Sequence, residues 1–326
     1  MDPDTDTGSD TDAEGRPLGS ARTDAERAVE KALGEIDTWS GRRIRYAPVP
    51  GGLQNSNWRI TVQGEPKRYF MKIPGAGSDA FIDRDVANQA ASRASALGIG
   101  PEVVRYDPVS GVEVIEFLDD YRACTTGDFA EVELAHQVIE HYRALHSAEP
   151  LSLTKTVFDM TDEHLAQVGE LGVRLPDDAE LLLTEYATGK AALLASGLDL
   201  VPCHNDPMPG NFLVADGKPL KLIDFEFASN NDRAYELAVL ITEMFYTEEQ
   251  TLELLEAYYG SAGWALTARI QVFSALADVK WGLWGCVNSA LITSWDFDYA
   301  KYGRWKLMRA RLKMTDPRWP FWLASV

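Results

Sequence analysis

The most constraining feature of this 326-residue sequence is the stretch from Cys203 to Ala228, CHNDPMPGNFLVADGKPLKLIDFEFA. It contains Asp206, then Asn211 five residues later, and it places Asp224 directly after the apolar segment LKLI. Two strand-like segments, FLV and LKLI, flank a turn at residues 216–217, so the chain is expected to fold back on itself here. The stretch therefore predicts a loop feeding two short strands, which brings Asn211 and Asp224 to one point.

These residue types match the chemistry of phosphoryl transfer. Carboxylate and amide oxygens are the ligands that Mg²⁺ prefers, and an aspartate ahead of them can accept the proton of an attacking hydroxyl. We predict Asp206 as the catalytic base and Asn211 and Asp224 as Mg²⁺ ligands. Each residue alone is equally well explained as a turn or capping residue, since Asp and Asn are common there. The spacing of all three together, with Glu226 adjacent, favours the site.

Composition and charge exclude several other functions. The formal charge of −19 repels phosphate backbones and anionic lipid surfaces, so we expect neither nucleic-acid nor membrane binding. A small cationic substrate would suit this charge, although solubility alone also explains it. The N-terminus has no apolar leader, and no run approaches the roughly 18 apolar residues of a membrane span. The three cysteines form no CxxC spacing, so a reducing cytoplasmic location is expected.

The order of predicted elements indicates an α+β chain of two lobes. Residues 1–22 are rich in Asp, Thr, Gly and Ser and are predicted to be a disordered acidic tail. Residues 23–118 contain a helix capped at Thr23 or Asp24, strand-like segments, a second helix ending at Gly98, and two more strands, which predicts a small N-lobe with an antiparallel sheet. Residues 119–326 have mainly helical patterns and are predicted to form a larger C-lobe.

Two features of the N-lobe suggest nucleotide binding. Gly51 and Gly52 precede Asn55 and Asn57 in GGLQNSN, and such a turn can place backbone N–H groups and amides over phosphates. An ordinary hairpin turn would have the same composition. Lys72 lies in the apolar segment YFMKIPG, where a charge is costly without a phosphate or carboxylate partner, unless it points to solvent from an edge strand.

With these motifs in place, the sequence resembles the choline kinase family, within the wider group of aminoglycoside phosphotransferases and protein-kinase-like enzymes. HNDPMPGN, IDFEFA and GGLQNSN are similar to its catalytic, metal and nucleotide segments, and the similarity runs from about Gly51 to Leu307. The resemblance implies a two-lobed protein-kinase-like fold that uses ATP and Mg²⁺. It also implies that Lys72 contacts phosphates and that the strand carrying Glu116 and Leu118 meets adenine. Asp85 is our candidate for the helix carboxylate paired with Lys72.

The acceptor is predicted from residues further along the chain. Trp281 and Trp284 in WGLW lie three residues apart, hence on one helical face, where ring quadrupoles can hold a cation that cannot donate hydrogen bonds. Two tryptophans at this spacing are also common in an ordinary core. The resemblance adds Tyr299 to this aromatic cage and makes Glu243 the acidic partner of the cation. It also places Phe227 beside the substrate, where eukaryotic relatives tend to have Tyr.

The predicted function is therefore an ATP- and Mg²⁺-dependent phosphotransferase acting on the hydroxyl of a small cationic amino alcohol, choline first. The alternatives are a kinase for ethanolamine, an aminoglycoside or another amino sugar, and, from a different class, a nucleotide-binding pseudokinase. The expected protein is a monomer or homodimer.

Overall fold

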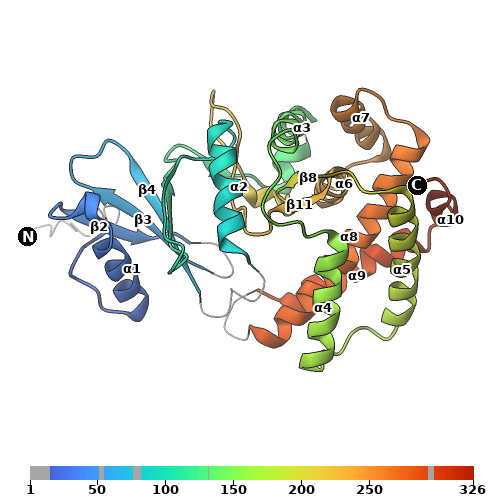
Figure 1. Cartoon of the computed structure of the whole chain (residues 1–326), viewed down its shortest axis with the longest axis horizontal. Coiled ribbons are helices and arrows are strands. Elements are labelled where there is room, and N and C mark those ends of the chain that lie inside the picture. Colours follow the sequence, from blue (N-terminus) through green and yellow to red (C-terminus); the bar gives the residue numbers. More distant parts are fainter. Residues whose placement is uncertain (1–14, 51–54, 76–81, 131, 293–296) are drawn as a thin grey trace, which may run out of the picture. The chain divides into compact units, whose positions relative to one another are not determined.

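The computed structural model describes residues 15–50, 55–75, 82–130, 132–292 and 297–326. The described chain forms two compact units, drawn with their elements in Figure 1. The first unit contains the residues up to Tyr121 together with Lys221–Ile223, and the second contains Arg122–Leu220 and Asp224–Val326. The break after Tyr121 lies close to the point where the sequence changes to a helical pattern.

The first unit is built on a six-stranded antiparallel sheet with strand order β1-β2-β3-β4-β6-β5. Its elements are β1 (Arg16–Pro17), α1 (Asp24–Gly34), the 3-10 helix η1 (Asp37–Trp39), β2 (Ile44–Pro48), β3 (Asn55–Val62), β4 (Arg68–Pro74), α2 (Arg84–Ala96), β5 (Val103–Tyr106), β6 (Glu113–Glu116) and β10 (Lys221–Leu222). The strands and helices expected between residues 23 and 118 are thus present.

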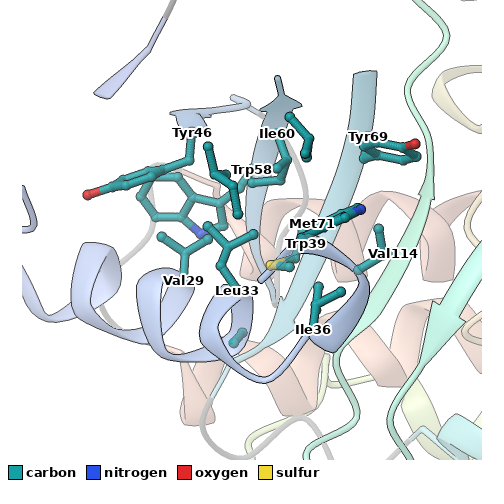
Figure 2. Packing of buried hydrophobic residues seen from close by; sticks show 13 residues of the cluster. Val29, Leu33, Ile36, Trp39, Tyr46, Trp58, Ile60, Tyr69, Met71 and Val114 are labelled. Carbon is teal, nitrogen blue, oxygen red and sulfur yellow. The ribbon is translucent and has the colours of Figure 1, made fainter. Parts of the chain in front are cut away.

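Helix α1 covers one face of this sheet. Thr23 caps the helix in a reciprocal capping box with Glu26, as the sequence predicted for Thr23 or Asp24. Val29 and Leu33 on the helix pack against the side chains on the inner face of the strands, among them Trp58 of β3 and Met71 of β4 (Figure 2). Burying this apolar face is what holds the helix on the sheet, since a helix of 11 residues is marginal by itself.

The predicted acidic tail is too long at its C-terminal end. Arg16 and Pro17 pair with Arg45 and Tyr46 of β2, so these residues belong to the sheet. Gly15 lies so close to β2 that an added Cβ would meet the Tyr46 carbonyl oxygen at 2.6 Å. Composition missed this strand because two residues carry no periodicity. Residues 1–14 lie outside the described part of the chain.

The second unit is mainly helical. Its elements are β7 (Arg122–Ala123), η3 (Thr126–Ala130), α3 (Val132–His146), α4 (Val157–Leu171), α5 (Ala179–Ser196), β8 (Leu200–Cys203), η4 (Pro209–Asn211), β9 (Phe212–Val214), β11 (Ser229–Asp232), α6 (Arg233–Glu243), α7 (Glu248–Tyr259), α8 (Trp264–Leu291), α9 (Tyr299–Met314) and α10 (Trp319–Leu323). Among the described residues, no helix is both long and apolar enough to cross a membrane.

Helices α8 and α9 lie side by side and approach unusually closely (Figure 1). A Cβ added at Gly285 would meet the backbone of Gly303 at 2.7 Å, and one added at Gly303 would meet the Gly282 carbonyl oxygen at 2.7 Å. Only glycine permits such contact between two helix backbones. The crossing fixes the positions of the aromatic residues that the two helices carry.

Two short strand pairs frame the stretch from Cys203 to Ala228. β8 pairs antiparallel with β11, with Cys203 opposite Ser229, and β9 pairs antiparallel with β7. The loop between β8 and η4 therefore begins beside the segment that follows Asp224. The reversal that the sequence predicted is a separate feature at residues 216–217, where the structure has a turn closed by a hydrogen bond from Lys218 N to the Ala215 carbonyl (3.2 Å).

Candidate active site

The loop after β8 is held in an unusual backbone conformation. Asn205 has φ = 68° and Asp224 has φ = 67°, both in the left-handed region. Residues other than glycine adopt this region rarely, Asn and Asp most readily, and such strain gathers at functional sites. The side-chain nitrogen Nδ2 of Asn205 donates to the Phe227 carbonyl (2.8 Å) and to Ser229 Oγ (2.8 Å). The two segments that carry the predicted catalytic residues are therefore tied together.

A buried carboxylate on α6 anchors the same loop. Glu236 accepts the backbone N–H of His204 at 3.1 Å and that of Asn205 at 2.6 Å. It also lies 2.7 Å from Nε2 of His146 on α3, whose Nδ1 lies 2.6 Å from the Tyr258 hydroxyl. Glu236 is fully buried, so these groups take the place of the water that an exposed carboxylate would bind. It determines where the chain enters the loop that carries Asp206.

Asp206 and Asn211 are brought into direct contact, as their spacing predicted. Asn211 Nδ2 donates to the Asp206 carbonyl oxygen at 2.8 Å and to Asp206 Oδ2 at 3.2 Å. The backbone N–H of Asp206 donates to His204 Nδ1 at 3.2 Å. These bonds fix the orientation of the Asp206 carboxylate.

The surroundings of Asp206 shift the pKa of its carboxyl group. Burial raises the pKa of Asp206 to about 6, and the charges of Asp224 and Glu243 add to this rise, whereas His204 and Lys280 oppose it. Asp224 is thus close enough for two negative charges to affect one another. Such a pair of carboxylates, with an amide beside them, is a donor set that suits a hard divalent cation.

Aromatic rings form a continuous wall in the same unit. Phe227 contacts Trp281 edge to face with ring centroids 5.2 Å apart, Trp281 contacts Trp284 at 5.6 Å, and Trp284 contacts Tyr299 at 5.5 Å. The rings of Trp281, Trp284 and Tyr299 are nearly buried. The four aromatic residues among the five predicted for the acceptor end therefore gather, from the segment before β11, from α8 and from α9. We call them the aromatic wall.

A lysine lies on this wall. Lys280 of α8 is 1% exposed, and its Nζ lies 3.0 Å from the ring centroid of Trp281 and 4.7 Å from that of Phe227. Burial lowers the pKa of Lys280 well below its ordinary value, and the charge of Asp206 acts in the opposite direction. Lys280 thus lies against the rings of the aromatic wall and within electrostatic range of Asp206.

Glu243, predicted as partner of a substrate cation, is engaged by two cations of the chain itself. It accepts hydrogen bonds from Lys306 and Arg309 of α9, and Arg309 also binds Asp278 of α8. Burial works to raise the pKa of Glu243, but Lys306 and Arg309 hold it below its usual value. The structure therefore places Glu243 in an ion-pair network between α6, α8 and α9.

The comparisons with known proteins agree with this arrangement. Residues 45–273 match the model of the phosphotransferase enzyme family. The chain belongs to this family. A choline/ethanolamine kinase family protein from Mesorhizobium loti is similar in structure, with a TM-score of 0.77 and 26% identity over 92% of this chain and 98% of that chain. The predicted resemblance and enzyme class, a small-molecule kinase, are confirmed.

Two sequence relatives of this phosphotransferase show the same relationship. Probable choline kinase 2 of Arabidopsis thaliana is 23% identical over 90% of this chain and 93% of that protein. Protein LicA of Haemophilus influenzae is 24% identical over 72% of this chain and 70% of that protein. More distant phosphotransferases of solved structure share the fold, so the predicted α+β, protein-kinase-like fold is confirmed.

The predicted nucleotide residues of this phosphotransferase lie in the first unit. Asn57 of β3 is the direct register partner of Lys72 on β4, and Glu113 of β6 is opposite Lys72 on its other side. Because side chains alternate along strands, these residues and Asn55 share the sheet face opposite to that of Met71 and the α1 core. The grouping of Asn55, Asn57 and Lys72 agrees with the predicted phosphate site. Their contact with a nucleotide stays a prediction.

Other nucleotide residues are placed differently. Glu116 pairs in register with Tyr69, on the face of the apolar core, and its carboxylate lies 3.1 Å from Lys67 Nζ. The strand ends at Glu116, so Leu118 lies beyond it, and contact of either residue with adenine stays a prediction. Asp85 accepts a hydrogen bond from the Tyr106 hydroxyl at 2.8 Å. The predicted glycines Gly51 and Gly52 lie outside the described residues.

Sequence reasoning missed three residues of this site: Asn205, Glu236 and Lys280. A signal existed for the last two, since each is a charged residue inside an apolar run, YELAVLI and ADVKWGLW. A buried charge is costly without a partner, so such a position indicates a specific role. Asn205 carried the weaker signal that Asn tolerates a positive φ.

Proposed function

We propose that this phosphotransferase transfers the terminal phosphoryl group of ATP to the hydroxyl of a small amino alcohol, with choline as the first acceptor to test. The contact between Asn211 and Asp206, close to Asp224, carries the proposal. It sets a base beside two oxygen ligands, which is the arrangement that hydroxyl phosphorylation needs. The kinase names of the sequence relatives and the aromatic wall support an amino-alcohol acceptor.

Each residue has a defined part in this reaction. Asp206 accepts the proton of the acceptor hydroxyl. The oxygen of that hydroxyl forms the new bond to phosphorus, and the bond from phosphorus to the leaving oxygen of ADP breaks. Asn211 orients Asp206 by its two hydrogen bonds. Lys72 contacts the nucleotide phosphates.

The donor set around Asp206 fits Mg²⁺. The Asn211 amide nitrogen is used on Asp206, so Oδ1 is the side-chain atom that Asn211 offers to a metal. Together with the Asp224 carboxylate it supplies oxygen ligands of the kind Mg²⁺ requires. When bound, the ion neutralises the phosphate charge.

The test is ADP release with ATP and a panel of choline, ethanolamine and an aminoglycoside. Asp206→Asn keeps the shape of the side chain but cannot act as base, so we expect kcat to fall by about 10²-fold or more. Binding of a fluorescent ATP analogue should be retained. Asp216→Asn, an exposed change in the same segment, is the matched control. Turnover that survives Asp206→Asn, or no ADP release with any acceptor, would refute the proposal.

A further inference from the structure

The aromatic wall already carries a cation that belongs to the protein. Lys280 Nζ lies over the rings of Trp281 and Phe227, and among the described residues it has no hydrogen-bond acceptor. A buried ammonium without an acceptor is costly, and the ring faces are the compensation that its immediate surroundings provide. The side chain is therefore held in the position where an aromatic surface holds a positive charge.

A substrate cation would need the same position. A quaternary ammonium has no N–H to donate, so its binding depends on ring faces and nearby negative charge. The Trp281 face is covered by Lys280, and the two positive charges would also repel one another. A cationic acceptor must therefore displace the Lys280 ammonium or bind beside it at a disadvantage.

The negative charge of Glu243, near the aromatic wall, is also balanced by cations of the chain itself. Glu243 is bound by Lys306 and Arg309, and Lys306 Nζ lies 5.0 Å from the ring of Tyr302. Tyr302 in turn contacts Trp284 of the wall, with ring centroids 5.7 Å apart. The chain thus supplies its own cations both to the rings and to the acidic group.

We propose that Lys280 is a specificity-determining residue, which competes with the positive charge of an acceptor for the Trp281 face and so favours acceptors whose bulky end is uncharged. The inference rests on the proposed function, because that function makes the aromatic wall the acceptor site. It concerns the charge of the acceptor and leaves the transfer step at Asp206 unchanged.

A pair of acceptors with equal shape and different charge tests the inference. Choline and 3,3-dimethylbutan-1-ol differ in that a carbon replaces the charged nitrogen. Lys280→Met removes the charge and keeps a long side chain, so we expect it to raise the ratio of kcat/KM for choline to that for the neutral alcohol about tenfold. Lys301→Met is the control, because it removes an exposed lysine that lies over Trp305, 5.2 Å from its ring centroid.

Binding without ATP separates this inference from the proposed function. Titration of tryptophan fluorescence should show choline binding about tenfold tighter to Lys280→Met than to the wild type, with the neutral alcohol unchanged. If this holds while no acceptor is phosphorylated, the proposed function fails and the inference stands. A thermal scan checks folding, and Lys280→Gln replaces the Met variant if that does not fold. An unchanged or lower choline preference, or binding of neither compound to either protein, overturns the inference.

Discussion

Replacing Glu236 by glutamine should loosen the catalytic loop at its anchor. In the wild type, one carboxylate oxygen accepts from Asn205 N, and the other accepts from His204 N and faces His146 Nε2. A glutamine keeps only one acceptor oxygen, and its best orientation leaves its NH₂ group facing the Asn205 N–H. One hydrogen bond to a charged group, worth about 1.5 to 3 kcal/mol, is lost, and the two others become neutral and weaker. We therefore expect the free energy of unfolding to fall by about 3 kcal/mol.

Two measurements check this prediction. Urea unfolding followed by circular dichroism gives the loss in free energy, which corresponds to a fall in Tm of roughly 6 to 12 °C for a unit of this size. Steady-state kinetics should show a lower kcat with little change in the KM for ATP, because Asn205 directly precedes Asp206. The control is Glu249→Gln, an exposed change on α7. A Glu236→Gln protein with the stability and kcat of the wild type would refute the anchoring role.

Three further outcomes follow from the site and its supports. Burial lowers the pKa of His164 from 6.5 to about 4, and the charges of Lys280 and Lys155 add to this effect. Below pH 6.5 the unfolded state therefore binds the proton more readily than the folded state, and stability falls on acidification. Between pH 8 and pH 5 the wild type should lose about 2 kcal/mol more than His164→Gln in urea unfolding; equal losses would contradict this. Gly303→Ala gains about 1 kcal/mol of helix propensity, but the backbone clash outweighs it, so unfolding should be easier by about 2 kcal/mol. Asp224→Asn should raise the Mg²⁺ concentration for half-maximal activity at least about tenfold, and an unchanged requirement would exclude it as a ligand.

Much of the fold could be predicted from local patterns in the sequence. Strand-like segments predicted the strands around Trp58 and Met71, and Thr23 marked the start of α1. The spacing of Trp281 and Trp284 placed both on one helix face. The contact between Asp206 and Asn211 was also predictable, because the loop that joins them is short. These features depend on neighbours in the sequence.

The remaining features depend on partners far along the chain. Glu243 is bound by Arg309, 66 residues away, and no pattern around either residue indicates the pair. Whether Lys280 points to solvent or onto Trp281 is decided by how α8 is buried in the second unit. The segment Lys221–Ile223 belongs to the first unit although its sequence neighbours belong to the second, because Leu222 N donates to the Ile99 carbonyl at 3.0 Å.

The glycine crossing of α8 and α9 has a consequence for how this enzyme can acquire new acceptors. Because Gly285 and Gly303 bring the two backbones into contact, the helices cannot tilt or shift against one another at the crossing without a clash. Changes in acceptor range must then arise from exchanging side chains on a fixed frame. A mutant library restricted to the aromatic wall and Lys280 should yield more altered specificities than one of equal size spread along both helices.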